Sequence, residues 1–231
     1  MSKRIGIVSP AFLWDSDQTN LDFYRFGNNY SKRIYECGGV PFGLLPQDGL
    51  RISEEALDFV DAFVVCGGTR MWPYHYQVVE YAITHGKRYL GICMGMQLLH
   101  RYFKLIDYAK ETGYTGDLFE LYQTHEGEDW VSLHRVEGHA KGFLRDHLDE
   151  CKHPVKLVPD THVHRLLGQD VIHAVTAHRH CAHHPSDKLV VSGYAEDGTI
   201  EVIEYGEQAI GVQFHPEPDD TLLPLFEFIC R

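Results

Sequence analysis

The sequence predicts a three-layer α/β sandwich with a mostly parallel central sheet and hairpins toward the C-terminus. Three observations predict this fold. Short apolar runs alternate with amphipathic segments through the first hundred residues. The apolar runs stop at glycine or proline, as buried strands do. A turn signal separates two alternating segments near the C-terminus.

The predicted elements follow in order along the chain. Apolar runs predict strands at residues 5–8, 40–45, 63–66 and 88–92. Apolar side chains at steps of three and four predict helices at residues 23–37, from 53, and at 76–85 and 94–105. Thr19 or Asn20 would cap the first helix, and Gly38 and Gly39 would end it. Repeated βα units of this kind imply a parallel sheet with helices on both faces.

The remainder of the chain is predicted less sharply. Residues 106–170 are rich in Gly, Asp, Glu and His, and we expect loops and short strands there, not a separate domain. Residues 189–195 and 199–205 flank a Glu-Asp-Gly turn and predict a hairpin. A strand at 208–214 and a helix at 221–229 complete one domain over residues 1–231.

The composition limits the classes of partner and the compartment. The formal net charge of −12 argues against non-specific binding to nucleic acid or to anionic membranes. No apolar run is long enough to span a bilayer, and the N-terminus has no secretory signal. The six cysteines show no framework spacing, which indicates reduced thiols and a cytoplasmic protein. We expect a small-molecule substrate, and the sequence leaves open whether the chain forms a homodimer.

A cysteine stands between a predicted strand and a predicted helix. Residues 91–97 read Gly-Ile-Cys-Met-Gly-Met-Gln, the pattern of a nucleophile elbow with sulfur in place of oxygen. The helix N-terminus would stabilise a thiolate at Cys93. It would also offer the Met94 amide to an oxyanion, with Gly68 as the second donor at a neighbouring strand end. A buried structural cysteine is the alternative for this motif taken alone.

A histidine at the end of a later strand is the candidate base. Residues 211–217 read Gly-Val-Gln-Phe-His-Pro-Glu. This places His215 where the chain breaks at proline, with Glu217 two residues on to hold the second ring nitrogen. A surface ion pair is the alternative for a His-x-Glu taken alone.

The two motifs together resemble the signatures of class I glutamine amidotransferases, a family with a flavodoxin-like fold. The chain is also similar to the branch typified by γ-glutamyl-γ-aminobutyrate hydrolase, through residues 38–41, 67–73 and 197–201. The resemblance implies that Cys93 attacks a γ-glutamyl amide, that His215 is the base and that Glu217 orients it. It further implies a thioester intermediate, no cofactor, and Gln97 and Ala177 holding the glutamyl group.

The sequence departs from that branch around the substrate. Met94 stands where the branch usually carries an arginine, and residues 175–181 match its pattern at only two positions. Arg70 and Arg179 are candidates to bind a carboxylate or phosphate on the leaving group, or they are solvated surface charges.

Histidines crowd the segment 178–184, where His178 and His180 would share a strand face and could bind a metal. We expect no metal there, because no recognised zinc spacing is present.

Three functions remain open. The first is a stand-alone hydrolase of small γ-glutamyl conjugates. The second is a glutaminase subunit that supplies ammonia to a separate synthase partner. The third is a non-enzymatic, His-rich metal-binding or regulatory relative.

Overall fold

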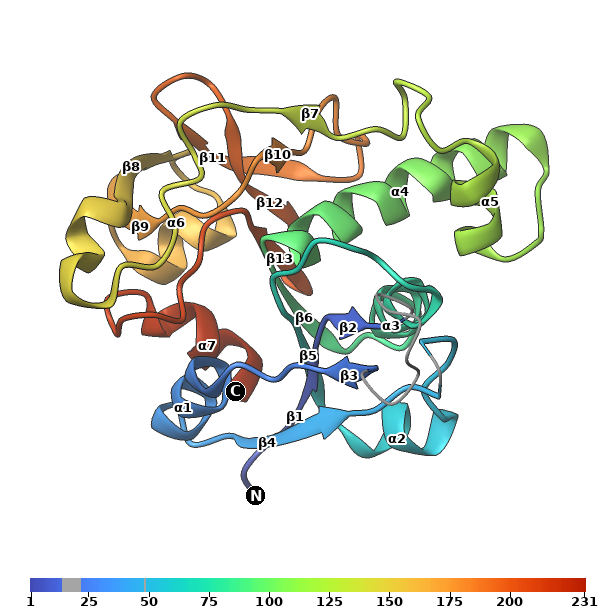
Figure 1. Ribbon diagram of the computed structural model, residues 1–231, viewed down its shortest axis with the longest axis horizontal. Coiled ribbons are helices and arrows are strands. Elements are labelled where there is room, and N and C mark those ends of the chain that lie inside the picture. The colour runs from blue at the N-terminus through green and yellow to red at the C-terminus, as the bar shows by residue number, and fades with distance from the viewer. Residues whose placement is uncertain (14–21, 48) are drawn as a thin grey trace.

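The computed structural model describes residues 1–13, 22–47 and 49–231. A nine-stranded sheet runs through the molecule in the order β4-β1-β5-β6-β13-β12-β11-β8-β9 (Figure 1). The five strands β4, β1, β5, β6 and β13 run parallel to one another. The pairs from β13 through β12, β11 and β8 to β9 are antiparallel. The predicted α/β fold class, with its mostly parallel core and C-terminal hairpins, is confirmed. The strands are β1 (Arg4–Val8), β2 (Ala11–Phe12), β3 (Phe23–Tyr24), β4 (Val40–Leu44), β5 (Ala62–Val65), β6 (Arg88–Ile92), β7 (His134–Arg135), β8 (Lys152–Leu157), β9 (Val171–Val175), β10 (His180–Cys181), β11 (Val190–Ala195), β12 (Ile200–Tyr205) and β13 (Ala209–Val212).

Helices cover both faces of the sheet, as the alternating pattern predicts (Figure 1). One face carries α1, α6 and α7, which share a buried apolar cluster with the strands. The other face carries α2, α3 and α4, with α5 packed on α3 and α4. Among the described residues no helix combines the length and the apolar character needed to cross a membrane. The helices are α1 (Asn28–Glu36), α2 (Glu54–Phe59), α3 (Pro73–Thr84), α4 (Met94–Thr112), α5 (Leu118–Thr124), the 3₁₀ helix η2 (Arg145–Cys151), α6 (His162–Leu167) and α7 (Leu223–Cys230).

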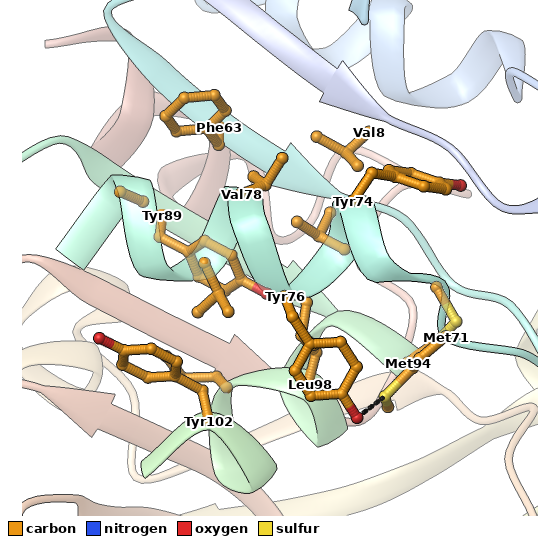
Figure 2. Close-up of a cluster of buried hydrophobic side chains, with 14 of the residues drawn as sticks. Val8, Phe63, Met71, Tyr74, Tyr76, Val78, Tyr89, Met94, Leu98 and Tyr102 are labelled. Atoms are coloured by element: carbon orange, nitrogen blue, oxygen red, sulfur yellow. Dashed lines mark hydrogen bonds between the residues drawn. The ribbon is translucent and has the colours of Figure 1, made fainter. Parts of the chain in front are cut away.

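The core under α3 and α4 fixes the start of α4, on which the candidate nucleophile depends. Figure 2 shows Tyr74, Tyr76 and Val78 of α3 among strand residues, with Met94 and Leu98 of α4 on the other side. Met94 and Leu98 are buried, and the Tyr76 hydroxyl donates to the Met71 sulfur at 3.7 Å. This packing holds the first turns of α4 against the sheet.

Two predictions about helices are wrong. The helix expected at residues 23–37 begins only at Asn28, because Phe23 lies in β3 and stacks on Phe12 at 4.9 Å between ring centroids. The expected caps Thr19 and Asn20 lie outside the described residues. The helix expected to end at residue 105 continues to Thr112 and stops at Gly113, whose φ of 72° is left-handed.

The prediction for residues 106–170 is also wrong in part. The segment contains helices α5 and α6, and the six-residue strand β8 lies inside the main sheet between β11 and β9. The hairpin prediction is confirmed, because β11 and β12 pair antiparallel around a turn at Gly198, where φ is 87°. The segment therefore extends the central sheet beyond its parallel core.

Candidate active site

The candidate nucleophile stands on a strained turn between β6 and α4. Cys93 is the N-cap of α4 and has φ 53° and ψ −104°, a left-handed conformation that is costly for a residue with a side chain. The Met94 amide follows at the first helical position, where no intrahelical acceptor exists. The thiol thus sits at the positive end of a 19-residue helix.

The two glycines of the elbow are required by close backbone packing. A Cβ on Gly91 would lie 2.4 Å from the carbonyl oxygen of Gly95, and a Cβ on Gly95 would lie 2.4 Å from that of Val65. Backbone atoms cannot yield as the end of a flexible side chain can. Only a residue without a side chain therefore fits at either position.

Gly95→Ala is expected to lower the free energy of unfolding by about 2 kcal/mol or more, because the new methyl group must push α4 away from β5. Gly86→Ala is the matched control, since a Cβ there meets nothing within 4 Å and only its φ of 66° opposes it. That control should cost about 1 kcal/mol. Urea unfolding followed by circular dichroism measures both, and equal losses would contradict the crowding argument.

The structure brings the candidate base and its partner to the nucleophile. The Nδ1 atom of His215 lies 2.7 Å from Oε1 of Glu217. The side chains of Cys93, His215 and Glu217 are all buried. Cys93 and the imidazole flank the same glycine, because a Cβ on Gly67 would lie 3.4 Å from Cβ of Cys93 and 3.3 Å from Nε2 of His215. Because Glu217 occupies Nδ1, Nε2 is the nitrogen left for the thiol. The His215 amide donates to Val175 at 2.8 Å, which ties this turn to β9.

The charge state of His215 follows from its neighbours. Burial by itself would lower the pKa of the imidazole, but the Glu217 carboxylate and the hydrogen bond with Cys93 outweigh burial and raise the pKa to about 10. The ring is therefore positively charged at neutral pH. An imidazolium stabilises a neighbouring thiolate, and this is how a histidine activates a cysteine nucleophile.

Tyr30 and Arg33 of α1, together with Phe143, support the base and its carboxylate partner. The Tyr30 hydroxyl accepts a hydrogen bond from the Gly67 amide at 3.2 Å, and burial together with the Glu217 charge raises the pKa of the phenol. The Arg33 guanidinium donates to the carbonyl of Glu217 at 3.1 Å. Phe143 packs edge-on against the His215 ring at 4.7 Å. No sequence signal pointed to Arg33 or Phe143.

The predicted oxyanion donors lie together beside the nucleophile. A Cβ on Gly68 would lie 3.0 Å from the Met94 sulfur, so the two residues are in contact. Gly68 and Cys93 line one cavity of about 380 Å³. Gly67 lies against the base, because a Cβ there would lie 2.6 Å from Cε1 of His215. A larger residue at Gly67 would therefore displace the base, and one at Gly68 would press against Met94 and Pro10.

Three of the four predicted substrate-binding residues line this cavity. Gln97, Ala177 and Arg179 border the same space as Cys93. Gln97 is 8% exposed and is held by Nε2 donating to the His180 carbonyl at 2.9 Å and to Oε1 of Gln213 at 3.2 Å. Its amide group is therefore fixed in orientation at the cavity wall.

Arg70 lies in an adjoining cavity instead. That space, of about 440 Å³, shares Thr69, Gln97 and His180 with the first and is also bordered by Arg101. The Arg70 guanidinium lies 4.3 Å from the ring centroid of Trp72. The two cavities together extend from the thiol to a region with two arginines.

His178 and His180, which were expected to share a strand face, do not share one. His178 is buried, whereas His180 in β10 is exposed, because the chain turns between β9 and β10 and does not continue as one strand. The Nδ1 atom of His178 lies 3.1 Å from the His180 carbonyl. The alternation expected for these residues is therefore wrong.

Comparison with known proteins places the chain in a family. The model of "Glutamine amidotransferase class-I" matches residues 20–228. A CTP synthase of Gluconobacter oxydans is 33% identical over 71% of this chain, and one of Roseiflexus castenholzii is 32% identical over 59%. The chain spans only 33% and 26% of the length of these relatives. A protein of Rickettsia prowazekii described as glutamine amidotransferase-like is 24% identical over 92% of this chain and 90% of its own length.

Solved structures agree on the fold. The glutaminase domain of a Trypanosoma brucei CTP synthase, solved with bound acivicin, matches with a TM-score of 0.61 over 98% of this chain and 91% of that one, at 14% identity. A Thermotoga maritima glutamine amidotransferase matches with a TM-score of 0.60 over 93% of this chain and 76% of that one, at 17% identity. These relatives support the class and not the narrower hydrolase branch. The chain therefore belongs to the class I glutamine amidotransferase family.

Proposed function

We propose that the chain hydrolyses the side-chain amide of glutamine and supplies the ammonia to a separate synthase partner. The observation that carries this proposal is the buried array of Cys93, His215 and Glu217 at the edge of one cavity. Glutamine as the substrate is supported by the match to the glutaminase domain of a CTP synthase and by the curated CTP synthases, which this chain matches over a quarter to a third of their length. The six free thiols suit a reducing cytoplasm.

The proposed chemistry proceeds in two halves. Cys93 attacks as a thiolate whose proton is held by His215; its sulfur bonds to the amide carbon, the carbonyl π electrons move to oxygen, and the amides of Gly68 and Met94 donate to the oxyanion. His215 gives its proton to the nitrogen, the C–N bond breaks, and ammonia leaves a thioester. His215 then takes a proton from water as the water oxygen bonds to the carbonyl carbon. The C–S bond breaks, and glutamate and free Cys93 are released.

One observation favours stand-alone hydrolysis of a γ-glutamyl conjugate as a second candidate. Ammonia needs almost no space, yet the cavity beside Cys93 adjoins the one bordered by Arg70 and Arg101. Two guanidinium groups there would suit a carboxylate or phosphate on a larger leaving group. This candidate keeps the same nucleophile and the same bond.

Glutamate release from glutamine and from a panel of γ-glutamyl amines, peptides and phosphorylated adducts separates the candidates. For a glutaminase, kcat/KM for glutamine exceeds that for every conjugate, and Arg70→Ala leaves it unchanged. A conjugate turned over at least tenfold better than glutamine, with a loss in Arg70→Ala, would establish the second candidate. No turnover of any amide, alone or with a co-purified synthase, would leave a non-enzymatic relative.

A further inference from the structure

Three histidines surround one buried carboxylate behind the wall of the active-site cavity. Glu201 on β12 is 0% exposed, and its Oε1 lies 3.1 Å from Nδ1 of His139, 3.2 Å from Nε2 of His178 and 3.6 Å from Nε2 of His153. His153 lies on β8, while His139 and His178 come from the segments after β7 and after β9. The cluster gathers four separate parts of the chain.

Two of the rings make hydrogen bonds on the sides that face away from Glu201. Nε2 of His139 lies 3.0 Å from Asp197, and Nδ1 of His178 lies 3.1 Å from the His180 carbonyl. An acceptor oxygen requires each of these nitrogens to carry a proton, so in a neutral ring the other nitrogen is an acceptor. The other nitrogens, Nδ1 of His139 and Nε2 of His178, face Oε1 of Glu201 at 3.1 Å and 3.2 Å, and either a proton on the ring or a metal ion must lie between each of them and the carboxylate.

The inner atoms lack hydrogen bonds although they are close to one another. Nδ1 of His139, Nε2 of His153 and Oε2 of Glu201 are buried without a hydrogen-bond partner among the described residues. The distance between His139 and Glu201 is short, yet the geometry is not that of a hydrogen bond. One donor atom each from His139, His153 and Glu201 lie within 4.8 Å of one another, so all three can reach a common centre. Buried groups left this way need an explanation.

We propose that His139, His153 and Glu201 bind a divalent transition-metal ion, with the neighbouring His178 as a fourth donor. Imidazole and carboxylate donors suit zinc, whereas magnesium and calcium prefer oxygen alone. A metal-bound histidine typically donates its outer N–H to a carboxylate or a backbone carbonyl, which is the role of Asp197 and of the His180 carbonyl here. The carboxylates of Glu201 and Asp197 would balance the charge of the ion.

The surroundings suit a structural ion that holds the cavity wall. The carbonyl of His139 accepts hydrogen bonds from the Thr176 hydroxyl at 2.7 Å and from the His178 amide at 2.9 Å. His178 and the neighbouring Ala140 and Ala177 border the cavity beside Cys93. The ion would link these loops to β8 and β12 while leaving the Cys93 thiol free. The inference does not depend on the reaction at Cys93.

Metal analysis of the untagged full-length protein tests the site. We expect about one zinc per chain by inductively coupled plasma mass spectrometry after dialysis. Glu201→Gln and His153→Ala should each reduce the content at least fivefold, whereas the control His183→Ala, which removes a histidine outside the cluster, should not. After chelation, Co²⁺ should produce the intense d–d absorption of a low-symmetry site, and Zn²⁺ should raise the melting temperature.

Two results would overturn the proposal. One is a metal-free wild type that binds neither Zn²⁺ nor Co²⁺ in calorimetry. The other is equal metal content in the wild type and in the folded His153→Ala variant. His153 sits nearer the surface than Glu201, with 11% of its side chain exposed, so this variant keeps the test valid if Glu201→Gln fails to fold.

Discussion

Replacement of Cys93 by alanine is expected to reduce amide hydrolysis by roughly 10⁴-fold or more, because the variant has no atom that can form the thioester. The substitution removes only sulfur from a position where the backbone is already strained, so the fold should persist. Glutamate formation under saturating glutamine measures the loss. Residual turnover above about a hundredth of the wild-type rate would contradict covalent catalysis at this residue.

The other thiols supply the control for this experiment. Burial raises the pKa of Cys37 and of Cys181 to about 11 and that of Cys230 to about 12, so these thiols stay protonated at neutral pH. Cys37→Ala should therefore retain full activity. An electrophilic glutamine analogue should label the wild type once, and peptide mass spectrometry should find the label on Cys93 and none in Cys93→Ala.

The nucleophile and base could be predicted from sequence because short contiguous segments determine their geometry. The elbow needs only a strand, two glycines and a helix start, and all of these lie within residues 88–97. His215 and Glu217 likewise lie two residues apart at a strand end. Arg33 could not be found in this way, because it reaches the Glu217 carbonyl across 184 residues of sequence.

The sequence of β8 does not reveal that this strand lies inside the central sheet. It contains Pro154, which argues against an interior strand, and only Val155 and Leu157 are buried in alternation. Pro154 pairs with β9, whereas the contact with β11 begins at Val155. The proline is therefore tolerated where only one side of the strand is paired, a detail set by tertiary structure.

The buried histidine cluster was beyond sequence reasoning for a similar reason. Its members lie at positions 139, 153, 178 and 201, and the chain has 16 histidines from which to choose. Local spacing selected His178 and His180, which the structure places in different environments. Only the pairing of β8, β11 and β12 brings His153 and Glu201 together.

Glu217→Gln is expected to lower kcat by roughly 10²–10⁴-fold, because an amide can neither stabilise the imidazolium nor enforce the tautomer that the base requires. Burial of His215 would then be opposed by Cys93 alone, so the pKa of His215 should fall below the wild-type value of about 10. Because the pKa of His215 changes, the pH–rate profile of kcat/KM for Glu217→Gln should differ in shape from that of the wild type. Glu227→Gln, at a partly exposed residue paired with Arg231, is the matched control and should leave both unchanged.

The same substitution should change how stability depends on pH. A histidine whose pKa is raised in the folded state stabilises the protein fully below its unfolded pKa, about 6.5. That contribution declines as pH rises and is lost once pH passes about 10 in the wild type. Glu217→Gln should therefore be less stable than the wild type at neutral pH. Its stability should not show the wild-type decline between pH 6.5 and about 10. Urea unfolding at a series of pH values measures both curves, and parallel curves would mean that Glu217 does not set the charge of His215.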